Sequence, residues 1–367
     1  MQDKVKNIVV TVLFSLIFIG FFLANVLMED VDISVAERRR LTQFPELTLR
    51  TVLSSRFMDQ FETYAAEQFP LRDQFRRVKT FMAFDVFRHL DNNDLFFIDD
   101  KIFSIIYPLN ENEVMRATNN TNNIINRYFQ NNPNVFLSII PNKNYFLPET
   151  SRHLRLDYER LVQIMTSEVN QAKYIDIFGT LNLDSFYRTD LHWRQEKLTD
   201  TVNTISRYMN MGLIHDNAHF EKTIVPNFRG SYFGQLGINI PPDELIFLNN
   251  WVLEDARVTF NNNQRGPVHN PRGKDSIDMY DIFLSGAKAL IQIDNPHAES
   301  ERELVIFRDS FGSSIAPLLI PAYGRITIID LRYISSNFVS QMVQFNDNQD
   351  ILFLYSVNIL NSGSILR

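Results

Sequence analysis

The chain has 367 residues, a formal net charge of −7 and no cysteine. The absence of cysteine excludes disulfides, zinc–thiolate sites and cysteine nucleophiles, and the acidic balance argues against a nucleic-acid-binding protein. The 31 Phe and 13 Tyr can build a sizeable core, and the length suits one large α/β domain with insertions.

The N-terminal segment predicts a membrane anchor. Lys4 and Lys6 precede an uncharged run from Ile8 to Met28, and Glu29 and Asp30 follow it directly. Such a run is long enough to cross a bilayer as a helix. Lysines before it and acids after it place the N-terminus in the cytoplasm and the remainder outside the cell. A cleavable signal peptide is the alternative, but its apolar region is usually shorter. We expect an uncleaved, single-pass anchor in a bacterial cell membrane.

Residues 30–90 are predicted to form an extracellular stalk and helical region that follows an anchor at 1–29. The stalk contains an arginine cluster at 38–40. Large apolar side chains then recur at helical spacing from 51 to 90, and Pro70 divides this pattern into two helices.

From about residue 95 short apolar runs alternate with helical patterns. The predicted strands are Leu95–Ile98, Val135–Ile140, Tyr174–Phe178, Leu304–Phe307, Ile326–Leu331 and Ile351–Tyr355, and the predicted helices are 113–130, 158–171, 196–209 and 336–344. This alternation predicts an α/β fold with a mostly parallel sheet covered on both faces. The stretch at about 215–300 breaks the alternation and predicts an insertion with β character. We therefore expect one α/β domain over 91–367.

Two short motifs together supply an acid, a base and a nucleophile. Asp190 and His192 are two residues apart, so in an extended segment their side chains point the same way. Asp190 can then hold the His192 ring in one tautomer, and an imidazole can activate a serine hydroxyl. Ser310 follows the strand pattern at Leu304–Phe307 and precedes a possible helix start at 312–316, where free N–H groups can hold an oxyanion. Alternatively, Asp309 or Ser310 merely caps that helix, and Asp190 and His192 form an ordinary surface pair.

Other side chains are weaker candidates. Lys143 follows a strand and could hold an anionic sugar group, and Trp193 could stack on a sugar ring, although plain packing accounts for such an aromatic equally often. His215 and His219 have a spacing found in helical metal sites, but the residues between them indicate a turn and no third ligand is near. We therefore expect no metal and no cofactor.

The chain resembles the DHHW family and, more broadly, the AlgX/AlgJ-type SGNH-hydrolase-like proteins. The segments that carry the resemblance are Glu37–Leu41, Phe69–Asp73, Tyr187–Trp193, Tyr280–Gly286, Arg308–Phe311 and Ile329–Tyr333. This resemblance implies an SGNH-hydrolase-like, flavodoxin-like three-layer domain with a permuted motif order, in which acid and base precede the serine. It also implies O-acetylation of an exported polysaccharide, with a membrane-bound O-acyltransferase as partner.

Site roles follow from the same resemblance. Ser310 would be the nucleophile, His192 the general base and Asp190 the residue that orients it. Tyr187 and Arg308, which lie in matching segments, join Lys143 and Trp193 as predicted substrate contacts.

The chain departs from the family pattern at two positions. Leu191 stands where a second histidine is common, but its side chain would point to the other face. Ala287 stands where family members commonly have an asparagine that helps bind the oxyanion, and one such donor is typically worth about 10²–10³ in rate. This departure keeps open a non-catalytic glycan-binding or scaffold role beside the acetyltransferase or esterase role.

Overall fold

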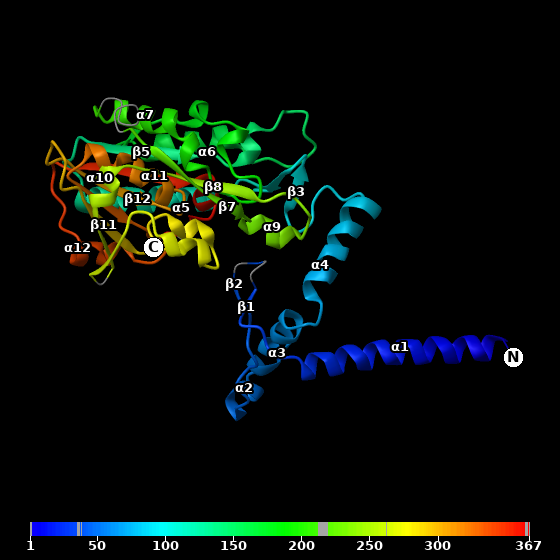
Figure 1. Cartoon of the computed structure of the whole chain (residues 1–367). Helices are drawn as coiled ribbons and strands as arrows, with labels where there is room; N and C mark the ends of the chain where they lie inside the picture. The colour runs from blue at the N-terminus through cyan, green and yellow to red at the C-terminus, as the bar shows by residue number, and fades with distance from the viewer. Residues whose placement is uncertain are drawn as a thin grey trace. The chain divides into compact units, whose positions relative to one another are not determined.

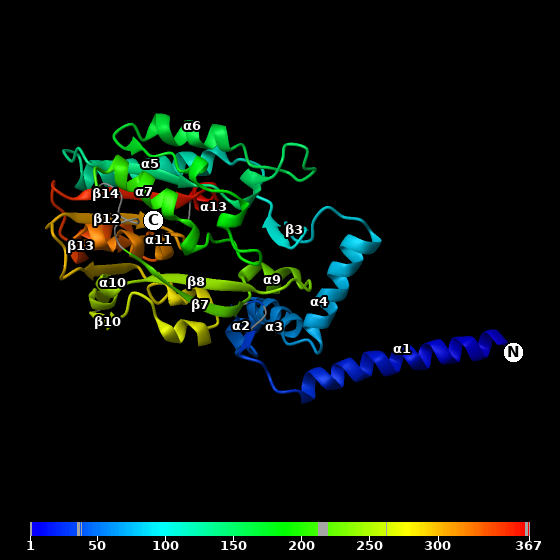
Figure 2. The same cartoon turned by 45° about the horizontal axis from the view of Figure 1, so that its top comes forward.

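The computed structural model describes residues 2–34, 37, 39–211, 219–261, 263–363 and 366. The chain divides into two compact units. The first runs up to Asn92 and includes Phe233–Asn239, and the second comprises Asn93–Tyr232 and Ile240–Arg367. The first unit carries the N-terminal helix and the second carries the central sheet (Figures 1 and 2).

The first unit is mainly helical. Its elements are α1 (Gln2–Leu27), β1 (Ile33–Ser34), β2 (Arg39–Arg40), α2 (Leu49–Leu53), α3 (Arg56–Glu67), α4 (Arg72–Phe81) and a π-helical turn at Met82–Val86. One helix near the N-terminus, Asp3–Leu27, is long and apolar enough to cross a membrane or to act as a signal sequence. The predicted helix break at Pro70 is confirmed, because α3 ends at Glu67 and α4 begins at Arg72.

The second unit is built on an eight-stranded sheet with the order β10-β9-β11-β13-β12-β14-β5-β6. Its strands are β5 (Val135–Ile140), β6 (Lys173–Tyr174), β9 (Arg257–Phe260), β10 (Gln264–Gly266), β11 (Leu290–Asp294), β12 (Glu303–Arg308), β13 (Arg325–Ile329) and β14 (Asp350–Ser356). The five strands from β13 to β6 are parallel, and β11, β9 and β10 continue the sheet antiparallel. Two antiparallel strand pairs lie outside it, β3 (Leu95–Ile98) with β4 (Lys101–Ser104) and β7 (Glu221–Phe228) with β8 (Asp243–Asn249).

Both faces of this sheet are buried. Along β12, Leu304 and Ile306 belong to one apolar cluster while Val305 and Phe307 belong to the other. This alternation is the period of two that a strand imposes on its side chains. The first cluster is covered by α7 (Thr199–Tyr208), α10 (Trp251–Asp255) and α11 (Gly312–Leu319), and the second by α5 (Glu111–Tyr128), α6 (Tyr158–Glu168), α12 (Val339–Met342) and α13 (Val357–Leu360). The predicted three-layer α/β fold is confirmed.

Three predictions differ in detail from the structure. The strand expected at 174–178 stops at Tyr174, because the Asp176 carboxylate accepts the Phe178 N–H and turns the chain into a 3-10 helix at Phe178–Thr180. The helix expected at 336–344 is shortened to a 3-10 turn followed by α12. Within 215–300, β9, β10 and β11 extend the central sheet itself.

Candidate active site

Ser310 lies at the carboxyl edge of the parallel strands. It follows the end of β12 at Arg308 and precedes α11, which begins at Gly312. The neighbouring Asp309 accepts two backbone hydrogen bonds. Its Oδ1 accepts the Phe311 N–H at 3.0 Å, and its Oδ2 accepts the N–H of Ser356 at the end of β14 at 2.8 Å. The Ser310 hydroxyl is therefore left free for another partner.

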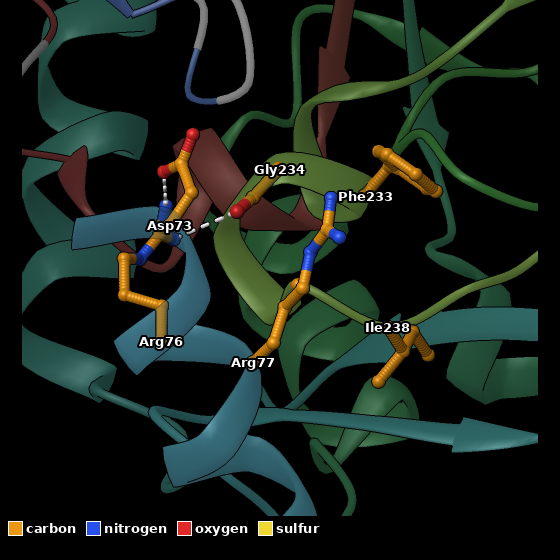
Figure 3. A pocket seen from close by; sticks show the side chains of 7 residues that line it. Asp73, Arg76, Arg77, Phe233, Gly234 and Ile238 are labelled. Atoms are coloured by element: carbon orange, nitrogen blue, oxygen red, sulfur yellow. Dashed lines mark hydrogen bonds and ion pairs between the residues drawn. The ribbon is translucent and has the colours of Figure 1, made fainter. Parts of the chain in front are cut away.

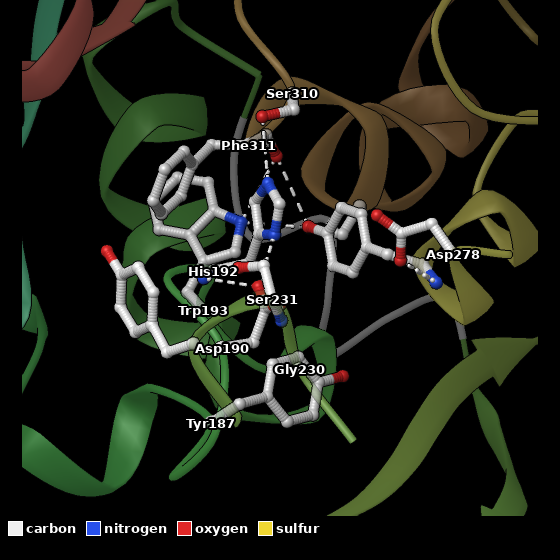
Figure 4. A network of polar contacts seen from close by, with 12 residues as sticks. Tyr187, Asp190, His192, Trp193, Gly230, Ser231, Asp278, Ser310 and Phe311 are labelled. Carbon is white, nitrogen blue, oxygen red and sulfur yellow. Dashed lines mark hydrogen bonds and ion pairs between the residues drawn. The ribbon is translucent and has the colours of Figure 1, made fainter. Parts of the chain in front are cut away.

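A tight loop holds the acid and the base. Phe186 and Trp193 form an antiparallel bridge, and the Tyr187 N–H donates to the His192 carbonyl at 3.1 Å. The intervening residues must therefore turn back within this short closed loop. Asp190 and His192 are both buried, and their side chains point the same way (Figure 4).

Ser310, His192 and Asp190 form a continuous hydrogen-bonded triad. The His192 Nε2 lies 2.8 Å from the Ser310 Oγ, and the His192 Nδ1 lies 2.6 Å from the Asp190 Oδ1 (Figure 4). Both distances fall within the reach that proton transfer requires. The carboxylate on Nδ1 favours the tautomer in which Nδ1 carries the proton and Nε2 accepts the serine proton.

Backbone N–H groups fix the Asp190 carboxylate from two sides. Its Oδ1 also accepts the His192 N–H at 3.0 Å, and its Oδ2 accepts the Ser231 N–H at 2.7 Å. Gly230 makes this approach possible. A Cβ at that position would lie 2.2 Å from the Thr189 carbonyl oxygen and 2.3 Å from the Asp190 Cβ. Gly230 is therefore required for steric reasons.

A second loop covers the imidazole. The Tyr280 ring stacks on the His192 ring with centroids 3.9 Å apart. The Tyr280 hydroxyl donates to the Ser314 Oγ at 2.8 Å, and the indole N–H of Trp193 reaches the same oxygen at 2.8 Å. Burial raises the pKa of Tyr280, so this hydroxyl remains a donor. Tyr280 thus restricts the rotation of His192.

The N–H of Ser310 is the oxyanion donor that the geometry offers. It has no hydrogen-bond acceptor within the described part of the chain, and it adjoins the nucleophilic oxygen. Ala287, where the family resemblance would place an asparagine, is exposed and follows three residues with positive φ, Leu284, Ser285 and Gly286. Its methyl group supplies no donor.

The four predicted substrate contacts lie inside the protein. Tyr187 and Trp193 are fully buried, and Arg308 is 1% exposed. Lys143 is 3% exposed and donates to the carbonyls of Tyr187 and Arg188, at 3.0 and 3.4 Å. Burial lowers the pKa of Lys143 to about 7. These side chains therefore offer a sugar no surface in this structure, and Lys143 supports the loop that carries the triad.

The structure adds residues that the motifs did not indicate. Gly230 and Ser231 lie in the stretch without periodic pattern, so nothing in their own segment marks them. Asp243 is similar, since its carboxylate organises the triad loop by accepting from the Thr189 N–H and Oγ1 at 2.9 and 2.6 Å. Tyr280 was within reach of sequence reasoning, because it opens one of the segments that resemble the DHHW family.

A basic groove lies at the same edge of the sheet. Arg265, Arg272 and Lys288 line a space of about 430 Å³ with the ring of Phe260 and with Ser285, and no carboxylate lines it among the described residues. Lys288 lies just before β11. The first residue of β11 pairs with the last residue of β13, and β13 is the direct neighbour of β12. At about 4.8 Å per strand, the groove begins about two strand spacings from Ser310.

The described residues contain no group of three or more His, Asp or Glu side chains placed to hold a metal ion. His215, one member of the histidine pair weighed above, lies outside the described residues.

Comparisons with models of protein families and with curated proteins find no match. Solved structures do match. A DHHW family protein from Eubacterium siraeum superposes with a TM-score of 0.62 at 16% identity, over 75% of this chain and 95% of that one. PatB1 from Bacillus cereus gives 0.60 at 18% identity, over 75% and 99%, and PatB1 with a sulfonyl adduct gives 0.58 at 17%, over 76% and 99%. The chain has an SGNH-hydrolase-like fold. The expected resemblance to the DHHW family is confirmed at the level of the fold.

Proposed function

We propose that the second unit is an SGNH-type O-acetyltransferase or acetylesterase that acts on a cell-surface or exported polysaccharide. The observation that carries this proposal is the hydrogen-bonded chain from the Ser310 Oγ through His192 to Asp190. A serine hydroxyl can act as a nucleophile when an imidazole nitrogen lies within hydrogen-bond distance and a buried carboxylate orients the imidazole. Ser310 has such an imidazole nitrogen at 2.8 Å.

The first half-reaction forms an acyl-enzyme. His192 Nε2 takes the proton from the Ser310 Oγ as that oxygen attacks the carbonyl carbon of an acetyl ester. The charge on the carbonyl oxygen is held by the Ser310 N–H, and the imidazolium is stabilised by the Asp190 carboxylate. Collapse of the tetrahedral intermediate breaks the ester bond. His192 then gives its proton to the departing alkoxide, which leaves Ser310 acetylated.

The second half-reaction reverses these roles. A hydroxyl group of the acceptor loses its proton to His192 and attacks the acetyl carbonyl, and the Ser310 Oγ leaves with that proton. A sugar hydroxyl as acceptor makes the protein a transferase, and water makes it an esterase. The basic groove at the same edge of the sheet supports a polymeric acceptor, because a chain of sugars bound at Ser310 is long enough to reach its basic side chains.

The N-terminal helix supports a location at the cell membrane. We propose that α1 crosses the membrane once, with the N-terminus in the cytoplasm and the second unit outside. A membrane-bound O-acyltransferase that moves acetyl groups across the membrane is the partner that the family resemblance suggests. Digestion of intact, wall-stripped cells with protease should then remove the second unit, and its protection would contradict this orientation.

A chromogenic acetyl ester tests the chemistry. In the purified full chain, Ser310→Ala and His192→Ala should each lose nearly all turnover, and the double variant little more, because the two residues act as a unit. Ser313→Ala is the matched control, since Ser313 is a buried neighbour outside the triad. Wild-type turnover in Ser310→Ala would overturn the proposal.

A non-catalytic role as a glycan-binding or scaffold component is the second candidate, and Ala287 is the observation that favours it. If the missing donor abolishes catalysis, the wild-type chain will show neither ester turnover nor an acyl adduct by mass spectrometry. It will still bind polysaccharide. Ala287→Asn should then introduce or raise turnover.

A further inference from the structure

The first unit exposes an unusual number of large apolar side chains. Those at least 48% exposed between residues 44 and 90 are Phe44, Leu47, Leu49, Val52, Leu53, Met58, Leu71, Phe75, Val78, Phe81, Val86, Phe87 and Leu90. Soluble proteins rarely display so many together, and contiguous apolar patches usually mark a surface that contacts a membrane or a protein.

Helix α4 has one side that is hydrogen-bonded to the segment Phe233–Asn239 and another side that carries exposed apolar side chains. Arg76 donates to the Gly234 carbonyl at 2.7 Å (Figure 3). It also donates to the Gln235 carbonyl at 2.8 Å, and Thr80 donates to the Leu236 carbonyl at 2.6 Å. Phe75 and Val78 lie on the opposite side of the helix, given 100° of rotation per residue. The exposure of these two side chains is therefore a property of the folded helix.

The apolar helix α1 contacts the same part of the unit. The Phe21 ring lies 5.3 Å from the Phe69 ring and 5.7 Å from the Phe75 ring. Asn25 donates to the Gln68 carbonyl at 3.3 Å. Phe21 lies six residues before the end of α1, which is about 9 Å of helix rise. A membrane that holds α1 therefore places the start of α4 at the depth of the lipid headgroups and upper acyl chains.

We propose that helices α2 to α4 lie on the outer surface of the membrane that α1 spans, with their exposed apolar side chains inserted among the lipids. This inference rests on the proposed membrane anchor. Interfacial helices combine an inserted apolar face with basic residues at the headgroups. Arg50, Arg56 and Arg77 fit the second requirement, because all three are exposed. The partner that this apolar surface contacts is a lipid bilayer with anionic headgroups.

The absence of cysteine makes a site-specific test possible. We would place one cysteine at Leu53 or Phe75, attach an environment-sensitive fluorophore, and reconstitute the full chain in vesicles of phosphatidylcholine and phosphatidylglycerol. Thr63→Cys is the control on the polar side of α3, and Glu159→Cys is the exposed control in the second unit. Lipids that carry a spin label near the headgroup should quench Leu53→Cys and Phe75→Cys at least threefold more than both controls.

The outcomes separate this inference from the anchor on which it rests. Resistance of the chain to carbonate extraction reports on α1 alone, and extraction would refute the anchor. A chain that stays in the vesicles but shows equal quenching at all four positions would overturn the lipid-facing surface. Equal quenching in vesicles combined with protection of Phe75→Cys from thiol reagents in cells would indicate a protein occupant and would also contradict the proposal.

Discussion

Asp190→Asn perturbs the triad with the smallest change of shape. The carboxylate accepts three N–H donors, the His192 backbone N–H and Nδ1–H on one oxygen and the Ser231 N–H on the other. An asparagine has one accepting and one donating end, so one end must face a donor in either orientation. If the amide oxygen stays on His192, the NH₂ group opposes the Ser231 N–H. If the amide turns over, the NH₂ group faces Nδ1 and forces the proton onto Nε2.

The second orientation is the more harmful to catalysis. A proton on Nε2 points at the Ser310 Oγ, so the imidazole can no longer accept the serine proton. The loss in kcat should reach about 10⁴, or about 5 kcal/mol of transition-state stabilisation. The unpaired donor should cost about 1–3 kcal/mol of folding stability, so the variant should still fold.

The assay is turnover of a chromogenic acetyl ester by the full chain, with thermal unfolding followed in parallel. Asp184→Asn is the matched control, because Asp184 lies on the neighbouring segment and its side chain is 77% exposed. Activity of Asp190→Asn within tenfold of wild type, in a folded protein, would refute the assigned role of the carboxylate.

Two further predictions follow from the same geometry. Gly230→Ala should lower kcat by about 10² with little change in KM, because a Cβ 2.2 Å from the Thr189 carbonyl oxygen must displace the Ser231 N–H from Asp190. Gly179→Ala is the control, because a Cβ at that position would meet nothing within 4 Å. Equal activity of the two variants would contradict this prediction. Burial lowers the pKa of His269 to about 3 from an ordinary 6.5, so the stability that its neutral ring contributes is present above pH 6.5 and lost as pH falls below it. Between pH 6.5 and 5.0 the free energy of unfolding of His269→Phe should therefore fall by about 2 kcal/mol less than that of the wild type, at about 1.4 kcal/mol per pH unit. Equal pH dependence of the two unfolding free energies in denaturant titrations would contradict this.

Local patterns marked the three residues of the triad as candidates but did not decide between catalysis and helix capping or a surface pair. An apolar run of strand length predicts that Ser310 lies just after the end of a strand. A spacing of two residues predicts that the side chains of Asp190 and His192 point the same way. The register that joins the two motifs 118 residues apart came from the family resemblance, since nothing local in either segment encodes it.

The surroundings of the triad could not be predicted in the same way. Lys143 resembles a solvated lysine because its burial depends on Phe103 and Tyr232, whose rings lie 5.5 and 5.2 Å from its Nζ and which are distant in sequence. Gly230 is recognisable only once the chain has brought it against Asp190. The segments that form β9 to β11 are too short and irregular in sequence to predict that they extend the central sheet.

Sulfonylation of Ser310 tests the central claim most directly. A sulfonyl fluoride forms a stable ester with an activated serine and releases fluoride, and a structure of PatB1 carries a sulfonyl adduct. Peptide mass spectrometry of the treated full chain should find one adduct, on Ser310, formed at least a hundredfold more slowly in His192→Ala and absent from Ser310→Ala. An adduct on another residue, or equal rates with and without His192, would contradict a serine nucleophile activated by this histidine.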